Sequence, residues 1–224
     1  MNELLVAPLG LAIIPIYMRI WTSDGAGKTS AFLATAFNLF IVAGAGILAA
    51  IAATGHSIVV LLASAKYAGA DRLIPVILAG LLVYGANVFV AAGLLIHKRT
   101  MQMSGLLVIS AALNIGLNCF LLPRMGLMGG AIATLLSYLV CIVSLAWASN
   151  RLLPLHIDLQ SCLKYLVAAG AAWAVASQLT IHTPLLDPLA KSAVVFSVYL
   201  AILYVIDRQV RNTMRQGLEW IGVC

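Results

Sequence analysis

The chain has 224 residues, of which 63% are hydrophobic and only 9% are charged, and its formal net charge is +6. A soluble globular domain carries about 25% charged residues, so this composition excludes a protein whose whole surface faces water. The mean hydropathy is +1.06. We therefore predict an integral membrane protein of the all-α class, a polytopic bundle of transmembrane helices in a lipid bilayer.

Seven apolar segments are predicted to cross the bilayer. They cover residues 4–20, 31–53, 73–96, 103–122, 127–149, 163–180 and 189–206. Residues 21–30, WTSDGAGKTS, are predicted to form a polar loop with Ser30 as a helix cap. Their GAGKTS does not fit a phosphate-binding loop, because Thr22 stands where the first glycine should be and no strand precedes it.

The last residues form a distinct segment. In residues 207–224, Arg208, Arg211 and Arg215 lie on one side of a predicted helix and apolar residues lie on another. We predict a basic amphipathic tail that rests on the anionic cytoplasmic leaflet.

The basic residues predict the direction of the spans. One side of the membrane would carry Arg19, Lys28, Lys98, Arg99, Arg151, Lys164, Arg208, Arg211 and Arg215, and the other side Lys66, Arg72, Arg124 and Lys191. The positive-inside rule then places the N-terminus outside and the C-terminus in the cytoplasm. Because a first span that starts outside is less usual, we expect part of the protein to be missing before residue 1.

Little in the sequence points to catalysis, metal binding or nucleic acid. A charge at the bilayer centre costs at least about 2.5–3.5 kcal/mol, and no Asp, Glu, Lys or Arg falls near the middle of a predicted span. The basic residues flank spans instead of forming one patch, and the cysteines lack metal spacing. We therefore predict no enzyme, no cofactor, no metal site and no nucleic-acid partner.

Amides, hydroxyls and glycines are what the predicted spans hold. The candidates for lining a substrate cavity are Arg19, Asn38, Tyr84 and Asn87. Each has a structural alternative. The arginine could instead extend to the membrane surface, and the other three could form hydrogen bonds between helices. Residues between 114 and 138 are assigned to helix packing around a Pro-Gly turn. They are Asn114, Asn118, Gly126, Gly130 and Thr134.

Several stretches carry a family resemblance. They are LLASAKYAGADRLIPVIL (61–78), LIHKRT (95–100) and above all ALNIGLNCFLLPRMGLMGGAIATLLSY (112–138). On these residues the chain resembles the C-terminal part of a polysaccharide exporter or O-antigen flippase of the multidrug, oligosaccharidyl-lipid and polysaccharide (MOP, MATE-like) superfamily. Residues 1–150 would be five spans of the C-terminal lobe, residues 151–206 two additional spans and residues 207–224 the tail.

The resemblance implies a function and partners. Members of this family are V-shaped bundles of two lobes that move undecaprenyl-diphosphate-linked oligosaccharide across the bacterial inner membrane for cell-surface polysaccharide synthesis. The seven spans would be helices eight to fourteen, so a fragment with this lobe alone is expected to be inactive without an N-terminal lobe. A polysaccharide polymerase is a further expected partner.

Two alternatives stay open at this point. A cation-coupled multidrug exporter shares the same fold, and would be favoured by an acidic residue within the membrane. A non-transporting membrane subunit of a polysaccharide-synthesis complex would instead assemble with an enzyme.

Overall fold

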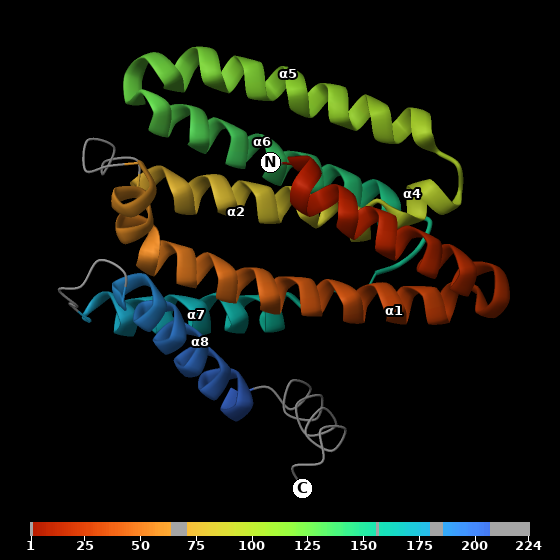
Figure 1. Ribbon diagram of the computed structural model, residues 1–224. Coiled ribbons are helices and arrows are strands. Elements are labelled where there is room, and N and C mark those ends of the chain that lie inside the picture. The colour runs from red at the N-terminus through yellow and green to blue at the C-terminus, as the bar shows by residue number, and fades with distance from the viewer. Residues whose placement is uncertain (1, 64–70, 156, 180–185, 207–224) are drawn as a thin grey trace, which may run out of the picture. The chain divides into compact units, whose positions relative to one another are not determined.

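The structure is a computed structural model that describes residues 2–63, 71–155, 157–179 and 186–206. Within these ranges the regular structure is helical and no strand occurs (Figure 1). The helices are α1 Asn2–Ala63, α2 Leu73–Gly85, α3 Asn87–Val90, α4 Ala92–Ile96, α5 Thr100–Met125, α6 Leu127–Asn150, α7 Leu159–Ser177 and α8 Leu186–Ile206. The predicted tail, residues 207–224, lies outside the described residues.

The described residues include helical stretches of membrane-spanning length and composition. Six stretches are long and apolar enough to cross a bilayer: Pro8–Leu61, Leu73–Ile96, Thr100–Met125, Leu127–Asn150, Leu159–Ser177 and Asp187–Ile206. The predicted all-α class of apolar, span-length helices is confirmed. The first stretch covers two of the seven predicted segments, which accounts for the difference in number.

The predicted loop at residues 21–30 is wrong, because the chain stays helical on both sides of a single residue. Gly25 has φ 82° and ψ −171°, a conformation that glycine adopts without a Cβ clash. Figure 1 shows the chain reversing direction within α1. Around the break, Asp24 pairs with Lys28 and the Thr29 hydroxyl donates to the Gly25 carbonyl, while Ser30 donates to the Pro154 carbonyl instead of capping a helix.

The span at residues 73–96 is interrupted twice, at Ala86 and Ala91. At the first interruption the Ala86 amide is shared between the carbonyls of Leu82 and Val83, both at 3.2 Å. Next to it, a Cβ on Gly85 would fall 2.7 Å from the Phe40 ring, and the Phe40 and Phe89 ring centroids are 5.4 Å apart. Glycine therefore allows this span to approach α1 closely.

Helices α5 and α6 form an antiparallel hairpin that runs alongside α2 (Figure 1). Gly126, with φ 60°, is the single residue between them. Nearer the end of α6, Val90 and Leu94 pack with Cys141 and Leu145 in a buried cluster. The predicted segments 103–122 and 127–149 lie within these two helices, with end points that differ by at most three residues at each end.

The chain divides into two compact units, which we describe separately. The first comprises Met1–Ile41 and Leu73–Asp158, and the second comprises Val42–Arg72 and Leu159–Cys224. Residues 42–72, which sequence analysis placed with residues 1–150, thus group with the C-terminal helices.

In the second unit α7 packs against α8, and polar contacts connect α8 to the part of α1 after residue 41. The hydroxyl of Ser57 donates to the carboxylate of Asp187, which also pairs with Lys191 at 2.9 Å. Farther along, the Tyr199 hydroxyl donates to the Val42 carbonyl at 2.8 Å. Gly46 leaves room for the Tyr199 ring, since a Cβ there would lie 3.0 Å from it.

Candidate functional site

A cavity of about 470 Å³ lies in the first unit between α2, α5 and α6. We call it the hydroxyl–amide cavity, because polar side chains from all three helices line it. They are Tyr84 from α2, Ser110 and Asn114 from α5, and Thr134, Ser137 and Tyr138 from α6. The cavity thus joins Tyr84, a predicted cavity residue, to Asn114 and Thr134, which were predicted as packing residues.

Hydrogen bonds across the α5–α6 hairpin fix the polar side of this cavity. The Ser110 hydroxyl donates to the Ser137 carbonyl at 2.7 Å, and the Asn114 amide lies 3.4 Å from the Thr134 hydroxyl. Asn118 does not line the cavity, but its amide donates to the Asn114 side-chain oxygen at 3.1 Å. Such bonds between membrane helices contribute about 0.6 kcal/mol each, so they orient the side chains more than they stabilise the fold.

Two tyrosines form the aromatic wall. The ring centroids of Tyr84 and Tyr138 are 4.8 Å apart, with the rings tilted by 39°. One turn before Tyr84, Gly80 faces α6, where a Cβ would be in ordinary van der Waals contact with the Tyr138 ring at 3.7 Å. The two tilted rings together give the cavity one aromatic side.

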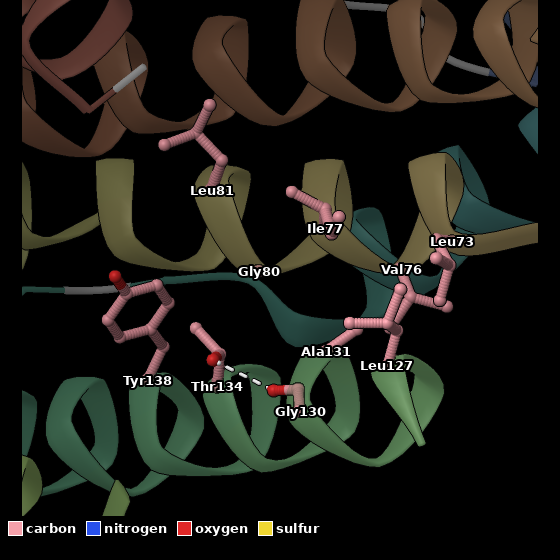
Figure 2. Close-up of a pocket in the computed structure, with 10 residues that line it drawn as sticks. All are labelled: Leu73, Val76, Ile77, Gly80, Leu81, Leu127, Gly130, Ala131, Thr134 and Tyr138. Atoms are coloured by element: carbon pink, nitrogen blue, oxygen red, sulfur yellow. Dashed lines mark hydrogen bonds between the residues drawn. The ribbon is translucent and has the colours of Figure 1, made fainter. Parts of the chain in front are cut away.

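An apolar groove of about 450 Å³ adjoins the hydroxyl–amide cavity (Figure 2). Its lining is drawn in Figure 2 and is mainly aliphatic: Leu73, Val76, Ile77, Leu81, Leu127 and Ala131. Thr134 and Tyr138 line both spaces, so the groove and the cavity meet at these residues. The Thr134 hydroxyl donates to the Gly130 carbonyl at 3.0 Å, as the dashed line shows.

The combined site contains no charged side chain in either lining. Amide, hydroxyl and phenol groups can donate and accept hydrogen bonds, and they keep this ability without a change of protonation. The arrangement can therefore bind a neutral polar group next to a hydrocarbon chain. It offers no acid–base pair for chemistry among its lining residues.

The other predicted cavity residues lie elsewhere in the first unit. Asn38 on α1 and Asn87 at the start of α3 each have a buried side-chain oxygen that has no hydrogen-bond partner in the described part of the chain. Tyr17, which sequence analysis did not single out, has the same property at its hydroxyl. Arg19 is exposed, and its carbonyl accepts hydrogen bonds from Thr22 and Ser23.

The residues assigned to packing have different surroundings. Gly126 is the turn between α5 and α6 and has nothing within 4 Å of an added Cβ, so it is not a contact residue. A Cβ added to Gly130 would lie 3.3 Å from the side-chain oxygen of Asn118. The tightest approach is at Gly129, which sequence analysis did not assign to packing.

Ser110, Ser137 and Tyr138 were also missed. A signal for them exists, because Thr134, Ser137, Tyr138 and Cys141 follow the i, i+3, i+4, i+7 spacing of one helical face, and Ser110 lies one turn before Asn114. The position of α2 decides what covers that face, and the sequence pattern does not predict this position.

No protein-family model, no curated protein and no solved structure matches this chain in comparisons with known proteins.

Proposed function

We propose that this protein is a component of a membrane transporter that moves lipid-linked oligosaccharide during cell-surface polysaccharide synthesis. The observation that carries the proposal is the junction of the hydroxyl–amide cavity with the apolar groove at Thr134 and Tyr138. A lipid-linked sugar has the matching chemistry, since its hydroxyls bind amides and hydroxyls, its ring faces pack on aromatic rings and its chain is apolar. The motif resemblance at residues 112–138 supports the same function.

The proposal includes a membrane arrangement. The two halves of α1, one on each side of Gly25, would be separate crossings, so that seven spans correspond to helices eight to fourteen of a two-lobed flippase. The basic residues would then lie mainly on the cytoplasmic side of the bacterial inner membrane, with the N-terminus outside and the C-terminus inside. A second lobe would supply the opposite wall of the translocation path, and a polysaccharide polymerase would receive the product.

A cation-coupled multidrug exporter is the less supported alternative. Such an exporter requires a carboxylate at membrane depth that can take up an ion. Asp187 is the buried carboxylate among the described residues, and it lies in the first turn of α8, already paired with Lys191 and Ser57. This position at a helix end suits a structural ion pair better than an ion-coupling site.

Deleting the gene tests the proposal. We expect surface polysaccharide to fall and lipid-linked oligosaccharide to accumulate on the cytoplasmic leaflet, measured by its accessibility to a glycosidase in inside-out vesicles. Restoring the gene should reverse both effects. Normal polysaccharide together with increased sensitivity to dyes or drugs would favour the exporter, and normal flipping with recovery of a polymerase in pull-downs would favour a non-transporting subunit.

A further inference from the structure

A third cavity lies at the other end of the α5–α6 hairpin from the Gly126 turn. Its volume is about 360 Å³. Its polar and aromatic lining residues are Arg99, Gln102, Trp147 and Arg151, and we call it the arginine pocket. The rest of its lining is apolar and includes no acidic residue, so the two positive charges are not neutralised by a carboxylate within the pocket.

The backbone before α5 fixes the position of Arg99. The Arg99 amide donates to the Leu94 carbonyl at 2.8 Å, and the Lys98 amide donates to the Leu95 carbonyl at 3.0 Å. Together with a φ of 56° at Lys98, these two bonds form a Schellman motif that ends α4. Arg99 therefore begins α5 at a defined place.

The helix to which Arg99 belongs repels its charge. Arg99 is the N-cap residue of α5, and the N-terminus of a helix carries partial positive charge from its free amide groups. A cation at this end is unfavourable, whereas an anion is favourable. The arrangement is consistent with a site whose positive charge is balanced by a bound anion.

Arg151 is held beside this helix end by an aromatic ring. Its guanidinium carbon lies 3.8 Å from the centroid of the Trp147 ring. The hairpin contains a matching pair at its opposite end, where the Arg124 guanidinium lies 3.6 Å from the centroid of Phe120. That pair lines none of the three cavities, and Arg124 is in the last turn of α5, where a cation is favoured.

The surroundings of the arginine pocket indicate the kind of anion. Both arginines lie at the ends of span-length helices, which is the level of lipid head groups. Trp147 is 64% exposed, as is typical of tryptophan at a membrane surface. In and beside the pocket, α5 presents exposed apolar side chains such as Ile109, which lines it, and Val108. An anion that carries hydrocarbon chains fits this combination better than a free ion.

We propose that the arginine pocket binds the phosphate of an anionic phospholipid, with the acyl chains along the exposed face of α5. Arg99 and Arg151 contact the phosphate oxygens, and Gln102 and the first amides of α5 are available as further donors. This inference goes beyond the proposed transport function and does not depend on it.

The test is lipid binding to the full-length protein purified in a mild detergent. Phosphatidylglycerol is titrated, and the bound lipid is counted by native mass spectrometry. We expect Arg99→Gln and Arg151→Gln each to weaken binding about fivefold, as one surface arginine is expected to contribute, and the double variant to lose it. Arg124→Gln, the matched control, should bind as the unaltered protein does.

Two further arms identify the ligand. Phosphatidylcholine should bind more weakly than phosphatidylglycerol, because its phosphate is neutralised by choline, and millimolar inorganic phosphate should not displace the bound lipid. Displacement by inorganic phosphate would overturn the lipid assignment in favour of a free anion site. Equal binding of both lipids, or full binding by a double variant that elutes as a folded monodisperse species, would overturn the proposal as a whole.

Discussion

Gly129 on α6 lies so close to α5 that a Cβ atom built on it would fall 2.3 Å from the Leu121 carbonyl oxygen. That oxygen belongs to the backbone of a helix, so it cannot move aside as a side chain does. The glycine that closes the hairpin is therefore Gly129, and Gly130 beside it faces the more adaptable side chains of Asn118 and Leu122.

We expect Gly129→Ala to destabilise the protein by about 1–3 kcal/mol, the usual cost of overpacking. Gly130→Ala should cost less, while Gly130→Leu should also reduce the amount of folded protein. The control is Gly116→Ala on α5, where nothing lies within 4 Å and alanine should stabilise the helix by up to about 1 kcal/mol. Thermal unfolding in detergent measures all four, and equal midpoints for Gly129→Ala and Gly116→Ala would contradict the close contact.

The ion pair between Asp187 and Lys191 gives a second prediction. Their side chains are only 7% and 17% exposed, and removing one partner of a buried pair costs about 3–5 kcal/mol because the other charge is left unpaired. We expect Asp187→Asn to lower the unfolding midpoint strongly, and the double variant with Lys191→Met to regain part of the loss. The exposed pair Asp24–Lys28 is the control, for which Lys28→Gln should cost at most about 1 kcal/mol. Equal effects of Asp187→Asn and Lys28→Gln would show that burial is not decisive.

The positive φ of Lys98 gives a third prediction, on backbone strain. A side chain in this left-handed conformation costs about 1–2 kcal/mol, and glycine is the usual residue at this position of a Schellman motif. We expect Lys98→Gly to raise the free energy of unfolding by about 1 kcal/mol. Lys98→Ala removes the same charge but keeps the Cβ, so it should not stabilise. A gain for the alanine variant alone would assign the effect to charge instead of backbone.

The fourth prediction concerns the pH dependence of stability. The imidazole of His56 lies 2.9 Å from the Asp71 carboxylate, and this hydrogen bond holds the pKa of Asp71 below its ordinary value of 3.8. A carboxyl whose pKa is lower in the folded state than in the unfolded state stabilises the fold at pH values above its unfolded-state pKa. This stabilisation is lost as the pH falls through the folded-state pKa. We expect His56→Gln to lower the unfolding midpoint slightly at pH 6, with the difference shrinking as Asp71 becomes protonated below pH 3.8. A difference that grows in acid would contradict this sign.

Hydropathy was sufficient to predict the helices, but not how they meet. The hairpin at residues 100–150 was predicted nearly to its ends, because two long apolar runs flank a Pro-Gly turn. The mostly polar stretch at residues 21–30 looks like a loop, yet the chain is helical on both sides of Gly25. The Asp24–Lys28 and Thr29–Gly25 contacts bridge this single non-helical residue. Polar composition alone does not distinguish these two outcomes.

The binding site shows the same limit. Tyr84 and Asn114 were both noticed as polar residues in apolar segments, but one was assigned to a cavity and the other to packing. Their side chains line one cavity only because α2 lies against the α5–α6 hairpin. That relationship spans thirty residues of sequence and arises from tertiary packing, which has no periodic signature.

The site itself supplies the fifth prediction. If the hydroxyl–amide cavity holds the sugar of the transported lipid, replacing Asn114 by leucine removes a hydrogen-bonding group, and replacing Tyr84 by alanine removes the ring that stacks on Tyr138. A hydrogen bond contributes about 0.5–1.5 kcal/mol, so each change should lower the rate of polysaccharide export about two- to tenfold at unchanged protein level. Arg19→Ala and Asn87→Ala should also lower export if these residues contact the substrate elsewhere on its path.

The controls for this prediction separate binding from stability. Ser144→Ala removes an exposed hydroxyl on α6 that bonds its own helix and lines neither space, so export should not change. Tyr84→Phe keeps the ring stacking and loses only the hydroxyl, so it should retain more export than Tyr84→Ala. Export is measured as surface polysaccharide per amount of membrane-inserted protein. If Asn114→Leu and Tyr84→Ala both export normally, the cavity is a packing defect between helices, and the sugar must bind elsewhere.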